Sequence, residues 1–141
     1  MADTELKRWP LKLAQTLGYS VRFNRETQQA FCVLEMGDLQ RNPRGSIHRG
    51  ITATMLDTAG GLTASLSENP DSVMPAPTIT LTINYVSAVA SGRSRAVGRV
   101  TGGGRKTKFA DCELRDEAHA LIATSTGVFK LLPDQRAGGG K

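Results

Sequence analysis

Residues 47–66 read IHRGITATMLDTAGGLTASL, and this stretch has the periodicity of one long α-helix. Apolar side chains recur every three or four positions and form one stripe along it, namely Ile51, Met55, Ala59, Leu62 and Leu66. The opposite side carries Ala53, Asp57, Gly60 and Ala64. A lone carboxylate thus lies among residues with almost no side chain, and the glycine pair at 60 and 61 costs about 2 kcal/mol of helix propensity relative to alanine. We therefore expect another part of the structure to approach that side closely.

The segments around this helix predict an antiparallel sheet. Thr78–Tyr85 alternates strictly, with Ile79, Leu81, Ile83 and Tyr85 on a face that we expect to be buried. Strand character is also present at residues 19–23, 30–35, 93–101, 106–115 and 120–131. Residues 3–15 predict a short N-terminal helix that Pro10 breaks or kinks. The order of elements predicts an α+β domain, with the long helix packed on one face of a curved sheet.

Length and composition favour one soluble domain. The chain has 141 residues, 39% of them apolar and 22% charged, which is enough to bury a core. We assign residues 1–132 to the domain, with 1–17 as a helical extension, and expect a disordered tail at 133–141. The N-terminus lacks the apolar run of a signal peptide or membrane helix. Cys32 and Cys112 stand far apart, so we expect no disulfide framework, no metal site and a cytoplasmic location.

The positive charge raises the question of a polyanionic partner. The net charge is +5 and the isoelectric point is about 9.6. Basic residues are spread over the chain, and only seven aromatic side chains are present (one Trp, two Tyr, four Phe), so we expect no nucleic-acid groove. Coenzyme A would satisfy the same charge. Gly104, Arg105, Lys106 and Lys108 could bind its phosphates, although a hairpin turn flanked by solvated charges explains them equally well.

A family resemblance adds to this interpretation. Residues 42–50 (NPRGSIHRG) and 55–61 (MLDTAGG) place an Asn six positions before His48 and an Asp nine positions after it. Together with residues 78–85 and 104–109, this pattern resembles the PaaI-type, 4-hydroxybenzoyl-CoA thioesterase-like family over residues 37–129. The resemblance implies the hotdog fold, in which a curved antiparallel sheet wraps a central helix. It also implies hydrolysis of an acyl-CoA or aryl-CoA, with coenzyme A as part of the substrate and no other cofactor.

The resemblance also implies roles for individual residues. Family members polarise the thioester oxygen with the amide N–H that follows the motif His; here this position is Arg49, where the family usually has Gly, and we assign the role to the Arg49–Gly50 backbone. Asn42 would orient this region, and His48 would shape the loop or contact the thioester. Asp57 matches the general base or nucleophile. Thr78 matches the hydroxyl that holds the attacking water.

Simpler explanations and other functions remain open for these residues. Asp57 could be a buried carboxylate bonded to Ser or Thr, and Thr78 is an ordinary residue for a polar strand face. A hotdog hydratase or dehydratase and a non-catalytic acyl-CoA-binding protein are the alternative functions. Nine residues separate His48 from Asp57, roughly 13 Å along a helix, which is too far for both to touch one thioester. We therefore expect a homodimer with shared sites and leave open whether dimers pair further.

Overall fold

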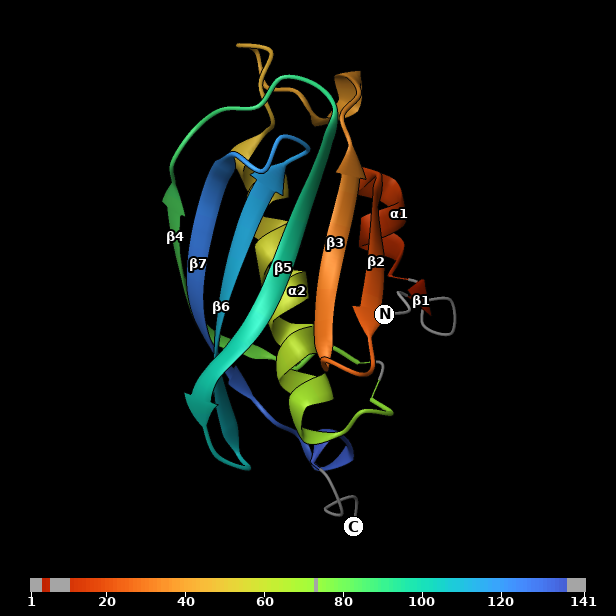
Figure 1. Ribbon diagram of the computed structural model, residues 1–141, viewed down its shortest axis with the longest axis vertical. Coiled ribbons are helices and arrows are strands. Elements are labelled where there is room, and N and C mark those ends of the chain that lie inside the picture. Colours follow the sequence, from red (N-terminus) through yellow and green to blue (C-terminus); the bar gives the residue numbers. More distant parts are fainter. Residues whose placement is uncertain (1–3, 6–10, 73, 137–141) are drawn as a thin grey trace.

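One long helix lies in the concave side of a single antiparallel sheet (Figure 1). The computed structural model describes residues 4–5, 11–72 and 74–136. The helices are α1 (Lys12–Leu17) and α2 (Arg49–Glu68), with short 3-10 turns η1 (Asp38–Gln40) and η2 (Pro133–Gln135). The strands are β1 (Thr4–Glu5), β2 (Tyr19–Asn24), β3 (Gln29–Glu35), β4 (Thr78–Tyr85), β5 (Arg93–Gly103), β6 (Thr107–Asp116) and β7 (Leu121–Lys130). Their order in the sheet is β1-β2-β3-β5-β6-β7-β4.

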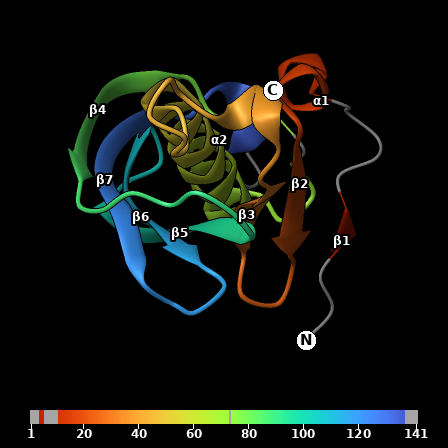
Figure 2. The same cartoon turned by 90° about the horizontal axis from the view of Figure 1, so that it is seen from above.

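This arrangement confirms the predicted hotdog fold. Figure 2, seen from above, shows the sheet curving around α2. The strands predicted from alternation all form, and their bounds move by no more than two residues at any end. The helix begins two residues later than predicted and ends two residues later. All strand pairs are antiparallel. β3 pairs with β5 and not with β4, the strand that follows it in the chain.

The core lies between α2 and the inner face of the sheet. The predicted apolar stripe of α2 is buried along its whole length, with Met55, Ala59, Leu62 and Leu66 fully covered. It packs against inward-facing residues of the sheet such as Leu34, Ala96 and Leu114. A second, smaller buried cluster forms around Phe129 near the C-terminal half of α2. Packing on both sides makes α2 a rigid platform for the side chains that it presents at its start and middle.

The small residues of α2 serve the chain's own packing, so the close approach predicted for this side of the helix is made within one chain. A Cβ atom at Gly60 would lie 2.7 Å from the Phe129 ring, and one at Gly61 would lie 2.9 Å from the Ala76 carbonyl oxygen. Ala64 is fully buried in the Phe129 cluster. The close approach predicted for this side of the helix therefore comes from β7 and from the loop before β4. Only Ala53 and Asp57 of the predicted small side stay half-exposed.

Both ends of the chain differ from the sequence predictions. Thr4–Glu5 forms a strand paired with β2, so the predicted helix at 3–15 is wrong at its start, and α1 begins only after Pro10. Residues 6–10 lie outside the described residues. At the other end, η2 occupies part of the tail expected to be disordered. Gln135 is buried there and donates to Ser65 Oγ and to the Met74 carbonyl, both at 2.9 Å, which fastens η2 to α2. Among the described helices, none is long and apolar enough to span a membrane.

Strand β4 forms one edge of the sheet, and its expected buried face is only partly covered. β4 pairs with β7 on one side alone. Leu81 and Ile83 are half-buried, but Ile79 is 54% exposed and Tyr85 is 44% exposed. The alternation is real, yet the chain by itself does not cover both ends of the strand. An uncovered edge strand with apolar side chains is suited to pairing with another chain.

Candidate active site

The loop before α2 is shaped by Asn42. Its side-chain oxygen accepts hydrogen bonds from the amides of Arg44 (2.9 Å) and Ser46 (3.2 Å), and its own amide donates to the Ser46 carbonyl (2.7 Å). Gly45 completes the turn in the left-handed region, at φ +84°, which a glycine adopts without strain. Asn42 thus holds the turn that delivers the chain to the helix start, and the structure shows no contact between Asn42 and Asp57.

The first turn of α2 leaves one backbone donor unused. His48 is the N-cap: its Nδ1 accepts from the Gly50 amide at 2.9 Å, and its carbonyl accepts from the amides of Ile51 and Thr52 at 3.0 and 3.2 Å. Because Nδ1 acts as the acceptor, the ring's remaining donor position is Nε2. Throughout the described part of the chain, no acceptor binds the Arg49 N–H. This free amide lies at the positive end of a 20-residue helix, a favourable place for an oxyanion.

A pocket opens beside this free amide. Its volume is about 440 Å³, and the helix start lines it together with the end of β4, the segment that follows β4, and β7. The Tyr85 hydroxyl donates to the Arg49 carbonyl at 3.2 Å, and the Arg49 guanidinium lies over the Tyr85 ring, 5.5 Å from its centre. The Arg49 side chain is thereby held by β4 next to the pocket. Sequence reasoning assigned a role to the Arg49 backbone but none to Tyr85.

Asp57 lies halfway along α2 and meets the start of β4. The Thr78 hydroxyl lies 2.5 Å from Asp57 Oδ1 and donates to it. The contact joins two of the predicted site residues that are 21 positions apart. On the next residue of the helix, the Thr58 hydroxyl bonds to the Tyr19 hydroxyl at 3.1 Å, and burial raises the pKa of Tyr19. Asp57 is half-exposed and oriented by one neighbour, so it remains accessible to a substrate.

Within one chain the site residues form two separate groups. Asn42, His48 and Arg49 line the pocket at the helix start, and Asp57 and Thr78 do not. Strand β4 connects the two groups, because Thr78 at its beginning contacts Asp57 and Tyr85 at its end contacts Arg49. The chain therefore places the free Arg49 amide and the Asp57 carboxylate at opposite ends of one exposed edge strand.

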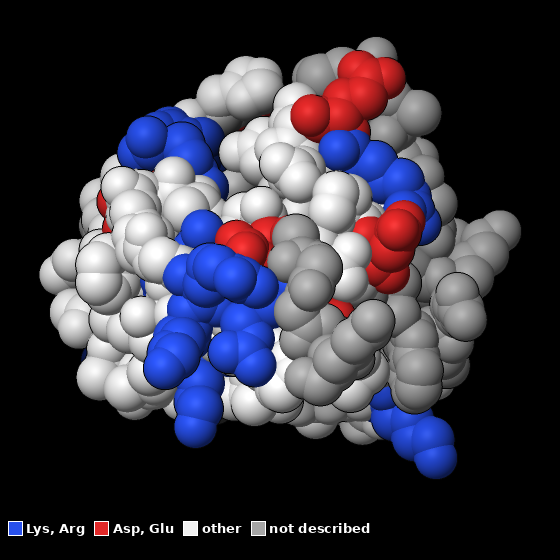
Figure 3. Space-filling model, turned by 90° about the horizontal axis from the view of Figure 1, so that it is seen from below, with Lys and Arg blue, Asp and Glu red and all other residues white. Residues whose placement is uncertain are grey.

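In the basic hairpin between β5 and β6, several of the groups predicted to bind phosphate already have partners within the chain. The Gly104 amide donates to the Thr107 carbonyl at 2.8 Å and closes the turn, so it is not free for a phosphate. Lys108 lies 3.4 Å from Glu68, and both side chains are only 15% exposed. Arg105 lies 3.9 Å from the same carboxylate, while Lys106 is exposed. Figure 3 shows Lys and Arg side chains gathered at this end of the molecule, with acidic side chains beside them.

The two cysteines are core residues. Cys112 lies under α2, where its thiol donates to the Leu56 carbonyl at 3.5 Å, and burial raises its pKa to about 12. Burial likewise raises the pKa of Cys32. Both thiols are free. In the described residues, His, Cys, Asp and Glu nowhere form a group of three or more that could hold a metal ion.

Comparisons with known proteins agree with this fold. The family model of the thioesterase superfamily matches residues 44–123. A conserved protein from Pseudomonas aeruginosa has 27% identity and a TM-score of 0.74, over 87% of this chain and 95% of its own. A mutant of the phenylacetic acid degradation protein PaaI from Thermus thermophilus has 23% identity and a TM-score of 0.72, over 86% and 100%. A thioesterase from Haemophilus influenzae has 20% identity and a TM-score of 0.71, over 91% and 96%. Among curated proteins, no relative matches.

Proposed function

Because the chain belongs to the thioesterase superfamily and is a thioester hydrolase, we propose that it hydrolyses acyl-CoA thioesters with Asp57 and the Arg49 N–H as its central groups. The observation that carries this proposal is the free amide at the helix start. Of the first four backbone donors of α2, three are occupied, and the remaining one, the Arg49 N–H, belongs to a residue that lines the pocket. A helix N-terminus with one free N–H next to a pocket is suited to stabilising the negative oxygen of a tetrahedral intermediate.

The proposed reaction uses one water molecule. The Arg49 N–H donates to the thioester carbonyl oxygen while Asp57 accepts a proton from water, whose oxygen forms a bond to the carbonyl carbon. Collapse of the intermediate breaks the carbon–sulfur bond, and the thiolate takes up the proton. Thr78 fixes the Asp57 carboxylate through its 2.5 Å hydrogen bond. A direct attack by Asp57 on the carbonyl carbon would form an anhydride that water then cleaves, with the same products.

We propose that two chains complete each site through their β4 strands. Antiparallel pairing of β4 with its copy sets the Thr78 end of one strand beside the Tyr85 end of the other. Thr78 contacts Asp57, and Tyr85 contacts Arg49. This pairing therefore brings the two groups of one site together from different subunits. It would also cover Ile79, Tyr85 and Val86, which are exposed in the single chain. The result is an obligate homodimer with two equivalent sites.

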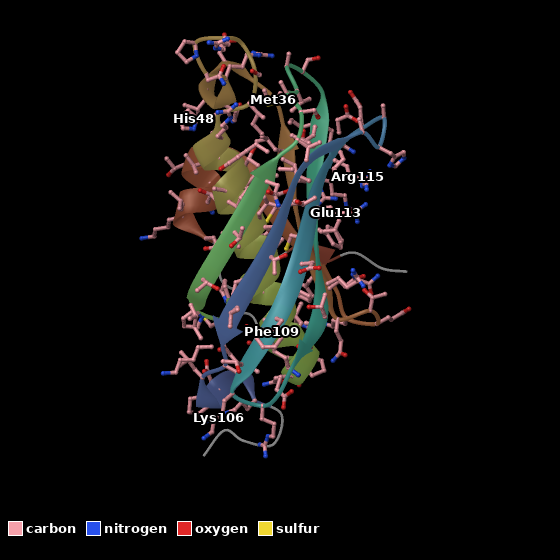
Figure 4. All side chains as sticks on the ribbon, turned by 90° about the vertical axis from the view of Figure 1, so that its left-hand side faces the viewer. Met36, His48, Lys106, Phe109, Glu113 and Arg115 are labelled. Atoms are coloured by element: carbon pink, nitrogen blue, oxygen red, sulfur yellow. The ribbon has the colours of Figure 1, made fainter. Side chains whose placement is uncertain are left out.

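The coenzyme A phosphates fit the β5–β6 hairpin only in such a dimer. His48 and Lys106 lie at opposite ends of the molecule's long axis (Figure 4). A two-fold axis across β4 reverses the second chain, so the hairpin of one subunit would lie toward the helix start of the other. Of the residues predicted for this role, Lys106 is the exposed cation, Arg105 shares Glu68, and Lys108 is neutralised by it. We therefore assign the phosphate contact to Lys106 and Arg105.

The decisive experiment separates the Arg49 backbone from its side chain. Position 49 is the first residue of the helix, where proline is well tolerated but supplies no N–H. Arg49→Pro should lower kcat by about 10²-fold on acyl-CoA substrates, the usual loss for one oxyanion donor, whereas Arg49→Ala keeps the N–H and should lose far less. Thiol release from short, medium and aromatic acyl-CoAs measures both variants. Equal losses in the two would remove the Arg49 N–H from the mechanism.

A further inference from the structure

Within one chain, the pocket at the helix start is lined by cationic residues and by no acidic residue. Arg44 lies on the turn before the helix, Arg49 is the first residue of the helix, and both residues line the pocket. None of its lining residues is Asp or Glu. Across the described parts of the chain, no carboxylate lies within ion-pair distance of either guanidinium. The positive end of the α2 dipole points toward the same region. A pocket of this kind favours an anionic ligand group.

The Arg49 guanidinium is held in place. The Tyr85 ring lies beneath it at 5.5 Å, and the Tyr85 hydroxyl binds the carbonyl of the same residue at 3.2 Å. Stacking on an aromatic ring restricts the side chain but leaves its N–H groups free to bind a planar anion in two-point fashion. The remaining walls include Ile47, Val86, Ala88 and Ile122, which suit a short hydrocarbon segment. The pocket thus combines apolar walls with fixed positive charge.

We propose that the enzyme prefers short acyl groups that end in a carboxylate, which Arg49 and Arg44 bind. This inference rests on the proposed function, because the Arg49 N–H sets where the thioester carbonyl lies. An anion bound by the side chain of the same residue must be within one side-chain length of that carbonyl. The far end of a three- to five-carbon acyl chain meets this condition. The phosphates of coenzyme A do not, since the whole pantetheine arm separates them from the sulfur.

The test compares pairs of thioesters that differ only in terminal charge. Succinyl and glutaryl thioesters are matched with butyryl and valeryl thioesters, each as the CoA and as the pantetheine derivative, which lacks the nucleotide phosphates. The measured quantity is the ratio of kcat/KM between the charged and the neutral acyl group. We expect this ratio to favour the carboxylate by at least about tenfold in the wild-type enzyme, on both carriers, because charge-assisted hydrogen bonds are among the strong ones.

Substitutions then assign the preference to the two arginines. Arg49→Gln and Arg44→Gln should each lower the charged-to-neutral ratio, and the double variant should bring it near one. The neutral thioester is the internal reference, since any disturbance of the Arg49 backbone lowers both rates together. Arg22→Gln, which removes an exposed arginine on β2, is the matched control and should keep the wild-type ratio.

Each contrary result has a distinct meaning. Hydrolysis of neutral thioesters with a wild-type ratio near one would overturn the carboxylate preference and leave the proposed function intact. Equal losses on charged and neutral substrates in the Gln variants would show that the guanidiniums serve the reaction itself, and losses confined to CoA carriers would show that they bind phosphate; either result overturns the inference. If a folded dimer hydrolyses none of the thioesters, the proposed function fails and this inference fails with it.

Discussion

The Asp57–Thr78 pair shows how the fold brings two ordinary residues into contact. A threonine on a strand face and an aspartate on a helix are unremarkable alone, but the sheet edge brings their side chains to 2.5 Å. The hydroxyl donates to the carboxylate and fixes its orientation, while the residue as a whole stays half-exposed. A fixed and accessible carboxylate is what a general base requires.

We predict that Asp57→Asn abolishes most of the activity without unfolding the protein. Asparagine keeps the shape and still accepts the Thr78 hydrogen bond, but it cannot take a proton from water. The expected loss in kcat is at least about 10²-fold, the usual scale for a positioned base. Asp71→Asn, at an exposed loop aspartate that pairs with Arg25, is the control and should keep wild-type kcat. Wild-type turnover by a well-folded Asp57→Asn protein would exclude Asp57 as base and as nucleophile.

At the scale of single residues, sequence reasoning singled out residues that belong to a motif and gave no role to a residue whose contact depends on the fold alone. The spacing of Asn42, His48 and Asp57 is visible in the chain, and all three lie at the helix start or on its accessible side. Tyr85 entered only as the last residue of the 78–85 strand, with no role of its own. Its contact with Arg49 depends on where β4 ends relative to α2, across 36 residues, and no local pattern encodes that distance.

At the scale of elements, α2 and β7 pack closely because Gly60 has no side chain. The Phe129 ring occupies the space that a Cβ atom at Gly60 would need, and Cys112 Sγ closes the same space from β6 at 3.3 Å. The sequence predicted a close approach to this side of the helix, correctly, but could not say that the approaching residue belonged to the same chain. Periodicity identifies a face and does not identify what covers it.

This packing predicts that two glycine substitutions differ in their effect on the free energy of unfolding. Gly60→Ala would place a methyl group 2.7 Å from the Phe129 ring and should destabilise the protein by about 1–3 kcal/mol, as overpacked cores do. Gly104→Ala adds the same methyl group where no atom lies within 4 Å, so the free energy of unfolding should change little. Denaturant unfolding of the two variants measures the difference. A Gly60→Ala protein as stable as wild type would mean that Phe129 moves without cost.

The buried thiols on the inner face of the sheet predict a loss of stability at alkaline pH. Burial raises the pKa of Cys112 to about 12 and raises that of Cys32 as well, so both stay protonated in the folded state. In the unfolded chain they ionise near pH 8.5, so above that pH the unfolded state binds fewer protons and is favoured as the pH rises. The free energy of unfolding should therefore fall between pH 8 and pH 10.

Thiol chemistry distinguishes this effect from general charge repulsion. Cys112→Ala removes one titrating group, so its free energy of unfolding should fall less steeply between pH 8 and pH 10 than that of the wild type. Alkylation by iodoacetamide at pH 8 should be slow in the folded protein and rapid in denaturant, because the buried thiols are neutral and inaccessible. An unchanged pH dependence in Cys112→Ala would show that Cys112 does not contribute to it.

At the scale of the whole molecule, local signals predicted an α+β domain with one long helix on a curved sheet, and the family resemblance added the hotdog topology. One long amphipathic helix between alternating segments leaves few architectures, and the strand bounds follow from alternation and from turn residues. The ends were less predictable. The helical pattern at 3–15 did not reveal the strand at Thr4–Glu5, and the polar tail did not reveal that Gln135 would be buried against Ser65. Both depend on contacts between residues distant in the chain.

The exposed edge of β4 leads to a prediction for the whole molecule: a single subunit is not catalytically active. Each chain carries a helix start at one end of β4 and Asp57 at the other. If the active site takes one group from each subunit, then the Arg49→Pro and Asp57→Asn proteins are both inactive. The first lacks the free N–H at position 49, and the second lacks the carboxylate at position 57. A heterodimer of the two has one site with both groups intact and one site with neither. Random exchange makes half of the dimers heterodimers, so about a quarter of wild-type activity should return.

The complementation experiment mixes the two purified variants under conditions that exchange subunits, with different affinity tags to isolate the heterodimer. Mixing each variant with a second batch of itself is the control and should restore nothing. Activity in the isolated heterodimer at about half the wild-type level per dimer would place the two groups in one shared site. If the heterodimer forms and stays inactive, the polariser and the base belong to the same chain, and the β4 pairing proposed here is wrong.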